Sequence, residues 1–151
     1  NRSTDIIYER KNGEIEFDNI EDPLPFDIEA PIINIGISDY AIWYRDLVEE
    51  MPKYHGKTVK FTGAVAIDKK MPDDCFIIGR PVMTCCADDI TFCGMLVKWD
   101  GSHMLKNADW VWLTASIEIR FNKLYGRKGP VLTAIDVAKT NPPEETVATF
   151  Y

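Results

Sequence analysis

The sequence predicts a mainly β protein, namely a five-stranded barrel of the OB type preceded by one α-helix and an extended acidic N-terminal arm. From Gly56 onward, apolar and polar residues alternate with a period of two, which is typical of strands. The connection between the third and fourth of these strands is long enough for a helical turn. Gly63 lies inside the first strand, where an OB-type barrel often bends. An SH3-like barrel or a small sandwich fits the same elements, because one sequence does not reveal the strand order.

The region before the strands divides into an arm and a helix. Residues 1–30 are acidic, and the run Asp22-Pro23-Leu24-Pro25 interrupts regular structure, so we expect an arm or linker with short edge strands at most. Residues 31–35 favour a short strand. A helix is then expected over residues 38–51, because a serine and an aspartate at its start can cap the first free amides. Its apolar face is formed by Ile42, Trp43 and Leu47.

The strands and their connections follow from the same alternation. The pair Asp100-Gly101 marks a turn after the third strand, and residues 102–107 favour one helical turn. The run Arg127-Lys128-Gly129-Pro130 is predicted to be the turn before the last strand. Residues 31–140 are therefore expected to form one domain, followed by a surface tail over residues 141–151. The strands are expected at residues 58–67, 75–83, 91–99, 110–121 and 131–138.

The charge of the chain is unevenly distributed. Seventeen basic and twenty-four acidic residues give a net charge of −7, which argues against a generally basic nucleic-acid binder. Residues 1–52 carry a net charge of −9, however, whereas residues 53–139 carry +4. The predicted barrel is thus mildly basic, and net charge excludes neither a nucleic-acid partner nor a membrane-facing role.

The sequence shows neither a membrane span nor a targeting segment. No run approaches the roughly 18 to 20 apolar residues of a membrane helix, and no signal-peptide pattern opens the chain. The first residue is Asn1 rather than methionine, so we expect a chain that has been processed or cut from a longer one, and composition does not decide whether membrane or targeting segments lie upstream.

The most unusual segment contains two adjacent cysteines followed by carboxylates. Cys85, Cys86 and Asp88 can offer soft and hard ligands to one metal ion, and a soft or borderline ion such as zinc is the expected cofactor. Adjacent strand residues point to opposite faces, so both sulfurs reach one site only if the chain turns here. The alternatives are a purely structural role or, in an exported chain, a Cys85–Cys93 or a Cys86–Cys75 disulfide. Otherwise Cys75 and Cys93 are expected to be small buried hydrophobic residues.

The sequence does not indicate an enzyme. The two histidines, His55 and His103, lie in predicted loops, whereas a Cys–His pair needs the imidazole within hydrogen-bond reach of the thiol. The chain contains no Gly-rich phosphate loop, no hydrolase nucleophile elbow and no zinc-protease motif.

Aromatic and basic residues raise nucleic-acid binding as an alternative. On an OB barrel, aromatic rings can stack bases while cations bind phosphates. Trp110 and Trp112 lie two residues apart on one face of a strand, however, so we favour core packing for them. The residues concerned are Trp99, Trp110, Trp112, Phe121 and Tyr125, with the cations Lys57, Lys60, Lys98, Arg120, Lys123, Arg127 and Lys128.

Several motifs together resemble a known family. They are Gly56-Lys57-Thr58-Val59, Phe76-Ile77-Ile78-Gly79-Arg80, Met83-Thr84-Cys85-Cys86-Ala87-Asp88 and Gly94-Met95-Leu96-Val97. Over about residues 32–140, the sequence is similar to the C-terminal domain of a bacterial family of membrane proteins of unknown function. The members of this family are described as subunits of a two-component permease complex.

The resemblance implies a membrane region upstream of this chain, a soluble OB-like domain outside the cytoplasm, and a permease subunit as partner. The motif positions in this sequence are Arg80, as a ligand-binding residue, and Cys85, Cys86 and Asp88. Residues 89–92 depart from the small residues of the family pattern, so the loop is expected to differ locally.

We therefore expect a non-enzymatic accessory domain of a membrane permease complex. Its cysteine loop is expected to bind a metal or another soft ligand through thiolates, or to contact the permease. A nucleic-acid-binding OB module and a purely structural spacer are the two alternatives.

Overall fold

The computed structural model describes residues 7–9, 15–17, 23–86 and 88–150, and its main element is a six-stranded β-sheet, which confirms the mainly β class. The strands are β1 (Ile7–Glu9), β2 (Ile15–Phe17), β3 (Ile33–Asn34), β4 (Thr58–Ala66), β5 (Cys75–Met83), β6 (Ile90–Lys98), β7 (Trp110–Asn122) and β8 (Arg127–Thr140). The helices are α1 (Tyr40–Glu49) and α2 (Met51–Tyr54), with 3₁₀ turns η1 (Ile37–Asp39) and η2 (Ser102–Met104).

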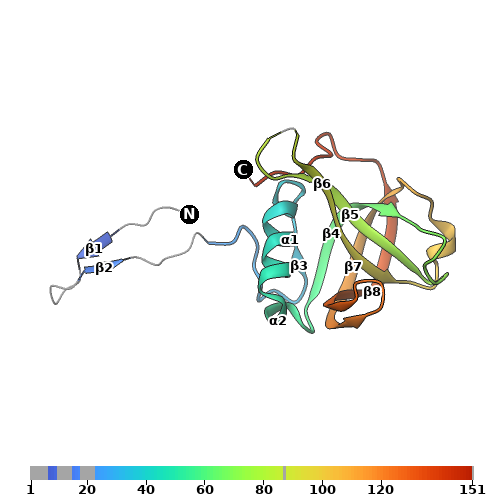
Figure 1. Cartoon of the computed structure of the whole chain (residues 1–151), viewed down its shortest axis with the longest axis horizontal. Helices are drawn as coiled ribbons and strands as arrows, with labels where there is room; N and C mark the ends of the chain where they lie inside the picture. The colour runs from blue at the N-terminus through green and yellow to red at the C-terminus, as the bar shows by residue number, and fades with distance from the viewer. Residues whose placement is uncertain (1–6, 10–14, 18–22, 87, 151) are drawn as a thin grey trace.

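The order of strands in the main sheet is β3-β4-β5-β6-β8-β7, and β4 also pairs with β7 (Figure 1). Hydrogen bonding therefore runs around a closed ring of β4, β5, β6, β8 and β7. Within this ring β6 and β8 run parallel, whereas the other neighbours are antiparallel. The strands β1 and β2 form a separate antiparallel pair.

Strand β4 changes partner in its second half. It pairs with β7 over residues 58–64 and with β5 over residues 64–66. A Cβ atom on Gly63 would lie 2.8 Å from Cγ1 of Ile78 and 3.1 Å from the carbonyl oxygen of Gly79. A glycine is thus required where β4 passes from one partner to the other, because any side chain would collide with β5.

The expected helix is present as α1, preceded by the turn η1. Asp39 is its N-cap residue, but its side chain makes no capping bond. Trp43 and Leu47 are fully buried as expected, and the rings of Trp43 and Phe61 lie 4.7 Å apart. Each fully buried side chain of this size contributes about 1.5–3 kcal/mol to stability. The helix is therefore held on the sheet by its apolar face.

Side chains of helix α1 also donate hydrogen bonds to the part of β6 that has no second strand beside it. Strand β8 pairs with β6 only from Leu96 onward. Before that point, the hydroxyl of Tyr40 donates to the carbonyl of Cys93 at 2.7 Å, and the hydroxyl of Tyr44 donates to the carbonyl of Gly94 at 3.2 Å. Tyrosine side chains thus take the place of a neighbouring strand over this stretch.

The turn predicted at Arg127-Lys128-Gly129-Pro130 is wrong, because these residues already belong to β8. The chain instead turns at residues 123–126, where Gly126 adopts a positive φ of 71° that favours glycine. Over its first four residues β8 pairs with β7, and β6 joins it only from Val131. Pro130 is tolerated because this stretch of β8 is an edge, where proline removes no bond of the ladder.

The C-terminal segment, expected as a surface tail, is fixed to β5. Ala148 is buried and pairs in parallel with Val82, through hydrogen bonds of 2.8 Å to Pro81 and 2.9 Å from Met83. The segment thereby returns beside α1 and the loop between β5 and β6 (Figure 1). Among the described residues, no helix combines the length and the apolar sequence that crossing a membrane requires.

Candidate metal-binding loop

The loop between β5 and β6 carries the two adjacent cysteines at the end of a strand hairpin. The backbone N–H of Asp89 donates to the carbonyl of Cys86 at 2.9 Å, and that of Thr84 donates to the carbonyl of Asp89 at 3.2 Å. These bonds turn the chain, so both thiols reach the same side of the loop. The sulfurs of Cys85 and Cys86 lie 4.0 Å apart.

Asp89, rather than Asp88, supplies the carboxylate beside the thiols. Its Oδ2 atom lies 2.6 Å from the sulfur of Cys85 and 3.9 Å from that of Cys86. The three ligand atoms all lie within 4.8 Å of one another, and Asp88 is outside this group. The i to i+3 bond of the turn brings residue 89 back over residue 86. The sequence suggests a turn after the cysteines but does not show that it starts at Cys86, and that starting point is what selects Asp89.

The electrostatics of the loop favour the protonated thiol of Cys85. The hydrogen bond to the Asp89 carboxylate raises the pKa of Cys85, and the contact with Cys86 raises it further. All three side chains are exposed, so burial has little part in this shift. A metal ion that binds here must therefore displace a proton from Cys85.

The distances suit a tetrahedral ion with thiolate and carboxylate ligands. For zinc, with Zn–S bonds of about 2.3 Å and Zn–O bonds of about 2.1 Å, two sulfurs are separated by ~3.8 Å and a sulfur and an oxygen by ~3.6 Å. The separations of 4.0 Å between the sulfurs and 3.9 Å between Cys86 and Asp89 are close to these values. The contact between Cys85 and Asp89 must lengthen. Three protein ligands would leave the fourth position open.

Of the other two cysteines, Cys75 is buried and Cys93 is half-buried. Cys75 is 6% exposed and packs with Leu96 and Val131, and burial, then Asp74, raises the pKa of its thiol. Cys93 is half-buried against the main core, and burial raises its pKa also. All four cysteines are free thiols. The position of Cys75 agrees with the small buried hydrophobic role expected for it, whereas Cys93 is only partly buried.

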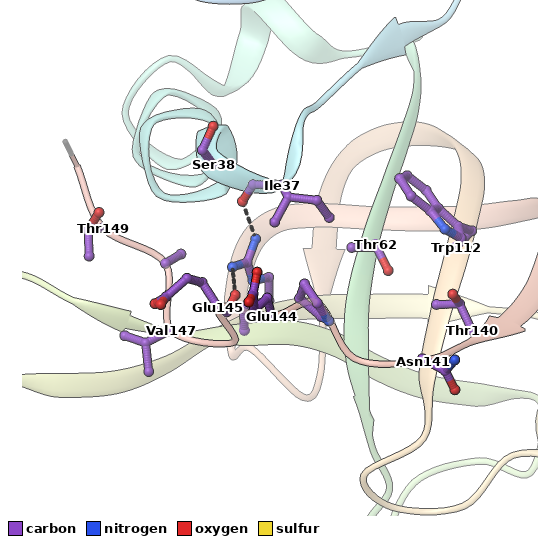
Figure 2. Close-up of a pocket in the computed structure, with 13 residues that line it drawn as sticks. Ile37, Ser38, Thr62, Trp112, Thr140, Asn141, Glu144, Glu145, Val147 and Thr149 are labelled. Carbon is purple, nitrogen blue, oxygen red and sulfur yellow. Dashed lines mark hydrogen bonds between the residues drawn. The ribbon is translucent and has the colours of Figure 1, made fainter.

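Arg80 lies in the interior, where it fastens other parts of the chain. Its side chain donates to the carbonyls of Ile37 at 2.5 Å, Glu145 at 3.1 Å and Thr146 at 3.3 Å (Figure 2). The guanidinium also lies 5.6 Å from the centre of the Tyr40 ring. Burial lowers its pKa, and among the described residues it forms no ion pair with a carboxylate. Arg80 is thus bonded to the main chain of two distant segments.

Arg80, which the sequence predicts to bind a ligand, also borders a cavity of about 750 Å³. Thr62, Trp112 and Asn141 are among its lining residues, and Glu144 and Glu145 bring two carboxylates to the same rim (Figure 2). The buried guanidinium of Arg80 therefore shares this cavity with two acidic side chains. Because both a cation and two carboxylates line the cavity, its charge does not favour an anionic ligand.

One tryptophan of the nucleic-acid alternative lies beside one of its cations, whereas three other cations border a cavity that no tryptophan lines. Trp99 packs edge-on against Phe76 at 6.4 Å, and Trp112 lies 5.8 Å from the amine of Lys60. A separate cavity of about 590 Å³ is bordered by Lys98, Arg120 and Lys123, together with Phe121. None of the tryptophans borders this cavity, so its cations have only Phe121 as an aromatic neighbour among the described lining residues.

Comparison with known proteins identifies the family. No curated protein matches this chain. The family described as the DUF1980 C-terminal domain matches residues 16–148, which include the cysteine loop and every strand of the main sheet. The chain therefore belongs to the DUF1980 C-terminal domain family.

Proposed function

We propose that this domain captures a soft or borderline metal ion such as zinc through Cys85, Cys86 and Asp89, without catalysing a reaction. The observation that carries the proposal is the convergence of two thiols and one carboxylate, within 4.8 Å of one another, on an exposed loop. Thiolates are strong ligands for zinc and softer ions, and a carboxylate completes a mixed set. Asp89 takes the role first assigned to Asp88.

The position of the loop supports reversible capture. The strands on either side of the loop, β5 and β6, pair with each other along nine residues, and this pairing fixes the two ends of the loop. The ligand side chains are exposed, so an ion can enter without opening the core. A fourth ligand is then a water molecule or a donor atom from a partner, and an ion held in this way can be passed on.

The wider context of the proposal is an accessory role in a membrane permease complex. The closed order of strands, with the turn η2 between β6 and β7, supports an OB-like fold for the domain. The resemblance to subunits of a permease complex supports a membrane anchor upstream, an extracytoplasmic position and a permease subunit as partner. In this setting the loop would present or collect the ion next to the transporter.

Elemental analysis of zinc-loaded protein under reducing conditions tests the proposal. We expect the wild type to retain about one zinc ion per chain after desalting, and the double variant Cys85→Ser/Cys86→Ser to retain none. Asp88→Asn is the matched control, because it removes a carboxylate of the same loop that lies outside the cluster. Equal zinc content in the wild type and the double variant would refute the proposal.

A further inference from the structure

The end of β7 and the turn into β8 combine cations with exposed apolar side chains. Residues 120–128 read Arg-Phe-Asn-Lys-Leu-Tyr-Gly-Arg-Lys, with four cations and no carboxylate. Phe121 is 60% exposed and Leu124 is 47% exposed. We call residues 120–128 the basic hairpin. Neither its charge nor its apolar surface contributes to the metal-binding loop.

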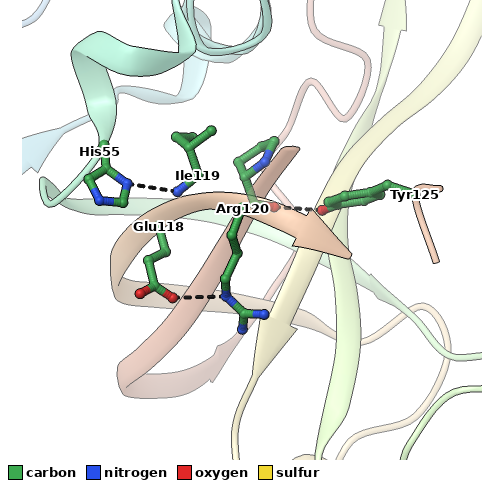
Figure 3. Close-up of polar contacts among 6 residues, drawn as sticks. His55, Glu118, Ile119, Arg120 and Tyr125 are labelled. Atoms are coloured by element: carbon green, nitrogen blue, oxygen red, sulfur yellow. Dashed lines mark hydrogen bonds and ion pairs between the residues drawn. The ribbon is translucent and has the colours of Figure 1, made fainter. Parts of the chain in front are cut away.

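Further cations converge on the basic hairpin from other parts of the chain. The cavity of about 590 Å³ beside it is bordered by Lys70 and Lys98 as well as by Arg120 and Lys123. Arg120 pairs with Glu118 at 2.9 Å (Figure 3). Among the described residues, the other three cations have no carboxylate within ion-pair distance. Since one carboxylate, Asp74, borders the same cavity, the surface keeps an excess of positive charge.

The basic hairpin is held firmly in this position. The hydroxyl of Tyr125 donates to the carbonyl of Pro130 at 2.6 Å and accepts from the backbone N–H of Leu96 at 2.7 Å. Burial raises the pKa of Tyr125 to about 12, so it remains a neutral donor. On the other side, Nδ1 of His55 accepts from the backbone N–H of Ile119 at 2.9 Å (Figure 3). The apolar tips are therefore fixed outward by the structure beneath them.

We propose that the basic hairpin docks on the surface of an anionic phospholipid bilayer. Phe121 and Leu124 would enter the boundary between headgroups and acyl chains, while the lysines and arginines bind lipid phosphates. An apolar tip surrounded by cations matches this surface in both polarity and charge. A single-stranded nucleic acid matches less well, because it stacks successive bases on several rings. Phe121 is the one aromatic side chain bordering this cavity in the described part of the chain.

The geometry keeps the metal-binding loop away from such a membrane. Strand β6 begins beside the loop at Ile90 and ends at Lys98, which borders the cavity. Nine residues of strand span about 26 Å. The thiols would therefore remain accessible while the other end of β6 faces the lipid.

Flotation with lipid vesicles tests this proposal. We expect the protein to bind vesicles containing phosphatidylglycerol, to bind pure phosphatidylcholine weakly, and to dissociate as salt is added. Lys123→Gln and Lys98→Gln should each weaken binding about fivefold, and Phe121→Ser/Leu124→Ser should abolish it. The matched controls are Lys106→Gln and Ile135→Ser, which change an exposed lysine and a 63% exposed isoleucine away from the cavity. These should bind like the wild type.

Three results would overturn the proposal. The first is equal binding to neutral and anionic vesicles, or to neither, at low salt. The second is unchanged binding of the Phe121→Ser/Leu124→Ser variant. The third is binding to a labelled oligothymidine without binding to vesicles, which would indicate a nucleic-acid surface instead. Because the substituted side chains are exposed, we expect every variant to fold. Circular dichroism of each variant checks that it does.

Discussion

Arg80 and Cys85 lie five residues apart in the chain, yet the structure surrounds them in opposite ways. Arg80 is 1% exposed, and its guanidinium is bonded to main-chain carbonyls of two segments distant in sequence. Cys85 is exposed, and within the described part of the chain its sulfur is hydrogen-bonded to its loop neighbours Cys86 and Asp89. The long-range hydrogen bonds are thus made by Arg80 in strand β5, whereas Cys85 in the following loop makes local ones. The ligand atoms of the loop remain free to exchange a proton for a metal ion.

The largest effect on stability is expected from the buried side of this comparison. Arg80→Met removes three hydrogen bonds and leaves the carbonyls of Ile37, Glu145 and Thr146 without this donor. The free energy of unfolding should fall by about 3–5 kcal/mol. Cys85→Ser/Cys86→Ser should change it by less than ~0.5 kcal/mol, because both side chains are exposed. Urea denaturation measures both, and similar values for the two variants would contradict the contrast.

The affinity for zinc should depend steeply on pH. The carboxylate of Asp89 raises the pKa of Cys85, so in the neutral range zinc must displace thiol protons. Affinity should therefore rise with pH and level off only above the raised thiol pKa. The proton that zinc displaces from Cys85 alone changes the affinity by about tenfold per pH unit. Competition titrations with a chromogenic chelator at several pH values measure this slope, and a flat profile would exclude thiolate ligands.

The adjacent aspartates of the loop provide a matched pair of variants. Asp89→Asn should weaken zinc binding by at least about tenfold, because its Oδ2 lies with the two sulfurs. Asp88→Asn should have no measurable effect on the affinity, since its carboxylate lies outside the cluster. Isothermal titration calorimetry of the two variants compares them at equal net charge. A larger loss for Asp88→Asn would show that the loop rearranges around the ion.

A smaller effect is expected on the reactivity of the apo thiols. Without the Asp89 carboxylate the pKa of Cys85 falls, so Asp89→Asn should accelerate alkylation of Cys85 about two- to fivefold near neutral pH. The same variant weakens metal binding, and the two readouts therefore move in opposite directions. Mass spectrometry after timed iodoacetamide treatment follows each cysteine separately. Cys75 serves as the internal control, because it is buried and should stay unmodified longest.

Most of the strands could be predicted from the sequence, and the clearest case is β7, where burial alternates from Trp110 to Ile117. The prediction for residues 75–83 coincides with β5, and the limits expected for the next two strands differ from those of β6 and β7 by one residue. The last strand was predicted too short. A proline and a glycine suggested a turn at residues 127–130, but proline is acceptable there because β8 is at an edge. That exception depends on strand order, which the sequence does not contain.

The candidate site was predicted in its chemistry and less well in its geometry. The adjacent cysteines were identified from residue type alone, whereas the choice between Asp88 and Asp89 depends on one hydrogen bond in the turn. The bonds of Arg80 could not be predicted at all. They join residues 43 to 66 positions apart, and nothing in the local sequence marks Ile37, Glu145 or Thr146 as partners.

X-ray absorption spectroscopy of the zinc-loaded protein tests the central claim most directly, because it reports the atoms bound to the metal. We expect a first shell of two sulfurs at about 2.3 Å, with oxygen or nitrogen ligands at about 2.0–2.2 Å in the remaining positions. In Asp89→Asn the two sulfurs should remain while the affinity falls. A first shell without sulfur, or one with four sulfurs that requires Cys75 and Cys93 to leave the interior, would contradict the assignment of Cys85, Cys86 and Asp89.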